Sequence, residues 1–132
     1  MPSRPVLAAA VAYFAVAFGA GFVLGALREI VVAPRLGGLA AVALEVPIML
    51  AIARIAAGAL VRRFAVPAGI APRLAMGGIA FVLLQIAEIL LAASFGATPA
   101  DYASGFLTAK GALGLAAQIV FAVLPVAVDR RG

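Results

Sequence analysis

The sequence predicts an all-α fold, an antiparallel bundle of four transmembrane helices. The chain is 67% hydrophobic and 11% charged, with a mean hydropathy of +1.24, whereas a soluble domain is about half apolar and about a quarter charged. Four apolar runs of 22 or 23 residues cover most of it: Val6–Leu27, Leu39–Val61, Leu74–Phe95 and Phe106–Val128. As a helix, each run reaches about 33 Å, against a hydrocarbon core of roughly 30 Å.

The first run is longer than the apolar core of a cleavable signal peptide, which has about 7–15 residues, so we expect it to remain as a span. Ala17, Gly21 and Gly25 recur at every fourth position within it. A ridge of small residues lets another helix approach closely, and the sequence therefore predicts a tight helix crossing along this face. The alternative is that these residues reflect only the Ala-rich and Gly-rich composition.

Proline and glycine separate the other runs. Pro34 lies in the first connector, and Pro67 with Gly69 lies in the second, where they prevent the helices from continuing. In the third connector, Thr98–Asp101 is predicted to cap a short interfacial helix. The connectors have 11, 12 and 10 residues, which leaves no room for a further domain. Residues 1–132 are therefore expected to form a single membrane domain.

Basic residues flank the predicted spans unevenly. Six lie on the side that holds both termini and the second connector: Arg4, Arg62, Arg63, Arg73, Arg130 and Arg131. The other side holds Arg28 and Arg35, and Lys110 is a third residue there if it is counted. Because cytoplasmic loops carry the excess of Lys and Arg, we expect both termini in the cytoplasm.

The chain contains no Cys and no His. Disulfides, thiolate chemistry, imidazole acid–base catalysis and the common zinc, copper and haem ligand sets are therefore excluded. The sequence also has no G-x-S-x-G nucleophile elbow and no phosphate-binding glycine motif. We expect no catalytic residue, no metal and no cofactor, and we expect that the protein is not an enzyme.

Ionisable residues inside the predicted spans are the most informative side chains. Glu45, Glu88 and Lys110 lie on three different spans, each roughly 6–11 Å below the non-cytoplasmic boundary. Arg28 lies just above them, at the end of the first span. A charge in hydrocarbon is costly unless it is paired, so the sequence predicts one buried cluster of Arg28, Glu45, Glu88 and Lys110.

Further polar residues are expected to support this cluster: Gln85, Gln118 and Arg35. Gln85 precedes Glu88 by one helical turn and therefore lies on the same face. Pro47 follows Glu45 by two residues. Because proline removes a backbone donor, we expect it to open the helix beside the cluster.

Two functions fit the cluster. We favour a structural ion-pair network in a structural or accessory membrane component, where the charges fix helix order without a substrate. The alternative is a small proton- or ion-coupled transporter or channel, in which one carboxylate takes up and releases a proton. The expected partners are the lipid bilayer and either further copies of the chain or a larger membrane protein complex. Nucleic acid is not expected, since the basic residues mark topology.

Several short motifs are similar to those of a known family. They are Tyr13-Phe14, Phe18–Arg28, Pro34–Gly37 and Glu45–Leu50, followed by Arg73-Leu74, Glu88 and Leu124-Pro125. In these motifs the chain resembles a widespread family of small four-span bacterial membrane proteins without assigned function. The resemblance implies a bacterial inner-membrane protein in which Arg28, Arg35 and Glu45 are central.

Overall fold

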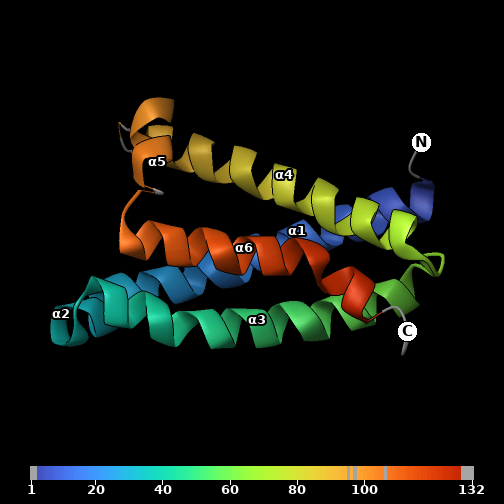
Figure 1. Cartoon of the computed structure of the whole chain (residues 1–132), viewed down its shortest axis with the longest axis horizontal. Coiled ribbons are helices and arrows are strands. Elements are labelled where there is room, and N and C mark those ends of the chain that lie inside the picture. Colours follow the sequence, from blue (N-terminus) through green and yellow to red (C-terminus); the bar gives the residue numbers. More distant parts are fainter. Residues whose placement is uncertain (1–2, 95, 97, 106, 129–132) are drawn as a thin grey trace.

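The protein is all-helical in the computed structural model, which describes residues 3–94, 96, 98–105 and 107–128 (Figure 1). Within these residues there is no strand. The elements follow the order α1 (Arg4–Leu27), the π-helical turn η1 (Arg28–Val32), α2 (Ala33–Leu36), α3 (Gly38–Arg63), α4 (Ile70–Ser94), α5 (Pro99–Gly105) and α6 (Ala109–Ala127).

Among the described residues, three helices are long and apolar enough to cross a membrane. They are α1 with η1, a continuous 29 residues, α3 with 26 residues and α4 with 25 residues. Their outer surfaces carry large apolar side chains, such as Ile30 at 75% and Ile55 at 73% exposure. Exposed side chains of this kind suit a lipid-facing surface.

The fourth helix begins later than its apolar run predicts. We expected a span from Phe106, but α6 begins at Ala109 and has 19 residues; Phe106 itself lies outside the described residues. The reason is a helix cap, because the Thr108 hydroxyl accepts a hydrogen bond from the backbone N–H of Gly111 at 3.0 Å. Such a cap satisfies a backbone donor that has no partner within the helix.

Helix α1 ends at Leu27, as predicted, but the chain stays helical beyond that residue. The chain continues beyond Leu27 through η1 and α2 to Gly37, although we expected a connector from Arg28. Gly37 has a φ of +87°, a conformation that glycine adopts at little cost. The chain turns there and α3 begins at the next residue.

The short helix predicted in the third connector is present as α5. The Thr98 hydroxyl accepts from the Asp101 N–H at 3.1 Å, and the Asp101 carboxylate accepts from the Thr98 N–H at 2.9 Å. These bonds form a reciprocal cap. The bond from the Thr98 backbone N–H also lowers the pKa of Asp101, because it favours the charged carboxylate.

The four long helices lie side by side (Figure 1), with α1 and α6 each packed against both α3 and α4. The buried core occupies one half of their length. It is built from the N-terminal parts of α1 and α4 and the C-terminal parts of α3 and α6: Val6, Ala9, Ala10, Tyr13, Ala17, Ala53, Ala57, Val61, Met76, Ala80, Leu84, Phe121 and Val128, with Val66 from the α3–α4 connector. This half is closed by close-packed side chains.

Tyr13 and Phe121 join α1 to α6 in the middle of this core. Their rings stack with centroids 4.1 Å apart and an interplanar angle of 15°. The Tyr13 hydroxyl donates a 2.6 Å hydrogen bond to the carbonyl of Phe121. Pro125, four residues later, has no N–H with which to satisfy that carbonyl inside the helix. The tyrosine therefore supplies the missing donor.

The tight helix crossing lies elsewhere than we predicted. At Gly21 an added Cβ would meet no atom within 4 Å, and at Gly25 it would meet only the Arg28 side chain of the same helical segment, at 3.5 Å. The prediction of a close crossing along Ala17, Gly21 and Gly25 is therefore wrong at the two glycines. An added Cβ at Gly77 on α4 would instead overlap the backbone carbonyl of Ala122 on α6.

Arg73, one of the basic residues on which the predicted topology rests, is 3% exposed. Its guanidinium donates to the carbonyls of Pro67 at 3.1 Å, Val66 at 3.3 Å and Pro125 at 3.5 Å. A buried charge is stable only when it is hydrogen-bonded. These bonds tie the α3–α4 connector and the base of α4 to the end of α6.

Candidate functional site

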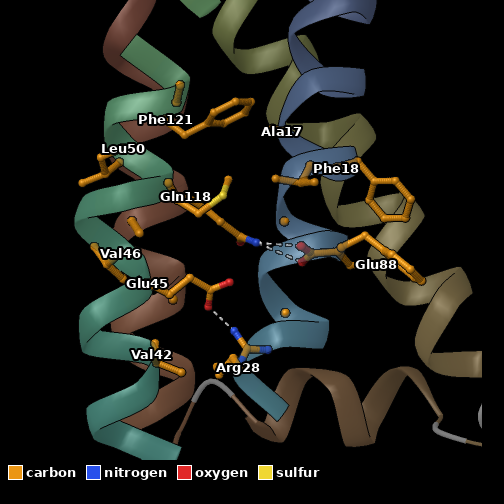
Figure 2. A pocket seen from close by; sticks show the side chains of 18 of the residues that line it. Ala17, Phe18, Arg28, Val42, Glu45, Val46, Leu50, Glu88, Gln118 and Phe121 are labelled. Carbon is orange, nitrogen blue, oxygen red and sulfur yellow. Dashed lines mark hydrogen bonds and ion pairs between the residues drawn. The ribbon is translucent and has the colours of Figure 1, made fainter. Parts of the chain in front are cut away.

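A cavity of about 720 Å³ occupies the other half of the bundle (Figure 2). Its walls come from all four long helices and from η1, and most of its lining is apolar, including Phe18, Phe22, Met49, Leu50, Leu84 and Phe121. Four lining residues, one from each long helix, also belong to the packed core: Ala17, Ala53, Leu84 and Phe121. They form the floor at which the cavity meets the closed half.

Small residues account for part of this space. Gly21, Gly25, Gly114 and Ala117 all line the cavity, and an added Cβ at Gly21 or Gly114 would meet no atom within 4 Å. Side chains this short cannot fill the distance between helices. The small residues of α1 therefore border an open volume instead of a helix contact.

Arg28 and Glu45 form an ion pair across the wall of the cavity. The Arg28 guanidinium donates to the Glu45 carboxylate, and its Nε donates to Glu29 at 3.1 Å. The side chains of Arg28 and Glu45 are 25% and 13% exposed, while that of Glu29 is 57% exposed. The pair is possible because α1 continues into η1, which places Arg28 beside the first third of α3.

Glu88 enters the cavity from α4 and is held by a glutamine of α6. The Gln118 amide donates to both carboxylate oxygens of Glu88, at 2.9 and 3.1 Å. Gln118 in turn accepts from the Gln85 amide at 2.5 Å. Figure 2 places Glu45 and Glu88 on different walls, both directed into the space between the helices.

The structure thus brings Arg28, Glu45, Glu88 and Gln118 to one cavity. Gln85 joins them through its bond to Gln118. The other predicted members of the cluster either lie outside the cavity or are not described by the structure. Arg35 is exposed on α2 and Pro47 is exposed on α3, whereas the side chain of Lys110 lies outside the described part of the structure.

Sequence reasoning missed the contacts of three residues, Glu29 and Tyr13 near the cavity and Arg73 at the opposite end of the bundle. Glu29 lay outside the predicted span, so its bond to Arg28 was not considered. Tyr13 was read only as part of a family motif. The signal for Tyr13 was Pro125, because a proline within a helix leaves the carbonyl four residues earlier in need of a donor. Arg73 carried no comparable signal, since a basic residue at a helix end is usually solvated.

In the described part of the chain, three helices are long and apolar enough to cross a membrane, and charged side chains line a cavity between the helices. Among the described residues, no group of three or more acidic, His or Cys side chains could hold a metal ion. Comparison with family models, with curated proteins and with solved structures gave no match to the chain.

Proposed function

We propose that the chain is a four-span protein of a bacterial inner membrane, an antiparallel bundle that acts as a small proton- or ion-coupled transporter or channel. The observation that carries this proposal is the cavity of about 720 Å³ with the carboxylates of Glu45 and Glu88 on its walls. A purely structural ion pair needs no such volume beside it. Carboxylates at a cavity are the groups that bind and release protons or cations.

A fourth span is consistent with the length of α6. Its 19 residues reach about 28 Å as a helix, close to the roughly 30 Å hydrocarbon core. With four spans, both termini and the α3–α4 connector lie on one side. The end of α3 and the first turn of α4, on either side of that connector, contain Arg62, Arg63 and Arg73, so the excess of basic residues favours the cytoplasm for this side. The cavity then faces the non-cytoplasmic side.

The packed core supports a one-sided pathway. Tyr13 and Phe121 close the cytoplasmic half by ring stacking and by the hydrogen bond to the Phe121 carbonyl. A transporter must be closed on one side while it is open on the other. The arrangement of core and cavity suits a state that is open outward.

A structural or accessory role is the second candidate, and one observation favours it. Among the described residues, no buried side-chain nitrogen or oxygen lacks a hydrogen-bond partner. A network this well satisfied can fix helix positions without a ligand. In that role the protein would act with further copies of itself or within a larger membrane complex.

Proton flux through reconstituted vesicles separates the two candidates. Vesicles loaded with a pH-sensitive dye receive an imposed pH gradient, and its dissipation is followed with and without the protein. We expect faster dissipation with wild type, slower dissipation with Glu88→Gln, and wild-type rates with Asp101→Asn, a matched loss of one carboxylate outside the cavity. Rates equal to those of empty vesicles would contradict the pathway and favour the accessory role.

A further inference from the structure

We infer that the cavity binds an organic cation with apolar substituents, whose charge lies between Glu45 and Glu88. This inference rests on the proposed function, because it needs a cavity that a solute can enter. It is argued from the charge, the lining and the volume of the cavity.

The charge of the lining favours a cation. Among the described lining residues, Arg28 contributes one positive charge, while Glu29, Glu45 and Glu88 contribute three negative charges, a balance of two negative charges. Lys110 lies one helical turn before the lining residue Gly114. If its ammonium is counted as well, the balance is still one negative charge.

The positive charge of Arg28 is already engaged, which disfavours an anion. Its guanidinium donates to both Glu45 and Glu29. An anion would have to displace one of these carboxylates in an environment where the remaining charges repel it. A cation meets no such barrier, because the described lining carries three carboxylates and one guanidinium.

The apolar lining indicates that the charged group of the ligand carries apolar substituents. Phe18, Phe22 and Phe121 contribute aromatic side chains to the lining, and Met49 and Leu50 add apolar surface. Aromatic faces attract organic cations, and quaternary ammonium groups bind well in such surroundings. A small hydrated metal ion would not bury this apolar lining, which would stay in contact with water. The described residues also offer no cluster of three metal-ligating side chains.

The volume fits a ligand with several substituents. About 720 Å³ lies within the roughly 300–1,000 Å³ typical of pockets for small organic molecules. A proton or an alkali metal ion needs far less space. Apolar walls with a few convergent charged groups are also the usual composition of such pockets.

Binding of two ions of the same shape and opposite charge tests the inference. Tetraphenylphosphonium and tetraphenylborate are equilibrated with purified protein in neutral detergent, and bound ion is measured by dialysis against protein-free micelles. We expect saturable binding of tetraphenylphosphonium and at least tenfold weaker binding of tetraphenylborate. Equal binding of both ions, or no saturable binding, would overturn the inference.

Variants locate the binding. We expect Glu88→Gln to weaken tetraphenylphosphonium binding at least tenfold, because it removes the charge and keeps the shape of the side chain. Asp101→Asn is the matched control on exposed α5 and should bind as wild type does. Gly21→Leu should weaken binding by filling the cavity without changing its charge, and thermal unfolding of the free proteins identifies any variant that fails to fold. Wild-type affinity in folded Glu88→Gln would contradict the assignment.

The two proposals fail separately. Selective binding of tetraphenylphosphonium without proton flux would support the cation site and overturn the coupled pathway. Proton flux with equal affinity for the two ions would support the pathway and overturn the cation site.

Discussion

Tyr13 donates a 2.6 Å hydrogen bond to the carbonyl of Phe121 and stacks its ring on the same residue. The hydrogen bond replaces the backbone donor that Pro125 lacks in α6. The stacked rings also close the bundle beneath the cavity. A change at Tyr13 should therefore affect both stability and access.

We expect Tyr13→Phe to lower the free energy of unfolding by about 1–3 kcal/mol, because the buried Phe121 carbonyl loses its donor. Pro125→Ala restores a backbone N–H that can reach that carbonyl within α6. The double variant should therefore lose less stability than Tyr13→Phe alone. Thermal unfolding in detergent measures all three proteins, and a double variant that shows the plain sum of the two single effects would contradict the link to Pro125.

Gly77 and Gly21 provide a matched pair for helix packing. Gly77→Ala should lower the unfolding free energy by about 1–3 kcal/mol through overpacking, since its Cβ would overlap the Ala122 carbonyl. Gly21→Ala adds the same methyl group where no atom lies within 4 Å, so stability should stay within about 1 kcal/mol of wild type. Equal destabilisation of the two variants in a thermal unfolding assay would contradict this assignment of the crossing.

The Arg28–Glu45 pair should contribute more to the free energy of unfolding than the Arg28–Glu29 pair. Breaking a buried ion pair typically costs about 3–5 kcal/mol, and because this pair is partly exposed we expect about 1–3 kcal/mol for Glu45→Ala. Glu45→Gln should lose less, since its amide still accepts a hydrogen bond from Arg28. Glu29→Gln alters a largely exposed group and should change stability by at most about 1 kcal/mol. Chemical unfolding in detergent ranks the three variants, and the reverse order for Glu45→Ala and Glu29→Gln would count against the pair.

Arg73 should behave as a structural residue. Arg73→Leu leaves the carbonyls of Pro67 and Pro125 without this donor, so we expect a loss of about 1–3 kcal/mol or more. Arg73→Lys should be only a partial rescue, because one ammonium cannot reproduce the planar spread of donors of the guanidinium. Arg54→Leu, on the exposed face of α3, is the control and should be near neutral. An Arg73→Leu variant that is as stable as wild type in thermal unfolding would contradict this structural role of Arg73.

The presence and approximate position of the four long helices were predictable from the sequence, because each apolar run is about as long as a helix that spans a hydrocarbon core. The helical ends were less predictable. The start of α6 depends on the Thr108 cap. A hydropathy profile does not detect a cap, so the apolar run alone places the start of the helix before Leu107. The continuation of the helix beyond Leu27 into η1 was likewise not predicted, because Arg28 and Glu29 interrupt the apolar run at that point.

The membership of the site was predictable in part, since Arg28, Glu45, Glu88 and Gln118 line the cavity whereas Arg35 and Pro47 do not. The pairing of these residues was less predictable. Depth along each span grouped Arg28, Glu45 and Glu88, because the helical rise converts residue number into distance. The direction of each side chain around its helix is not fixed by depth, and Glu88 bonds to Gln118 on α6. Gly21 and Gly25 were misread because a small residue can border either a close helix or an empty volume, and only the packing of the other helices decides which.

Labelling of single cysteines tests the division of the bundle most directly, since the chain contains no Cys of its own. A membrane-impermeant maleimide is added to right-side-out and inverted vesicles that carry Val46→Cys in the cavity wall, Ala57→Cys in the closed core, or Arg62→Cys as a marker of the proposed cytoplasmic side. We predict labelling of Val46→Cys from the non-cytoplasmic side alone, of Arg62→Cys from the cytoplasmic side alone, and of Ala57→Cys from neither. Labelling of Ala57→Cys, or labelling of Val46→Cys from the cytoplasmic side, would contradict a cavity that is open outward above a closed core.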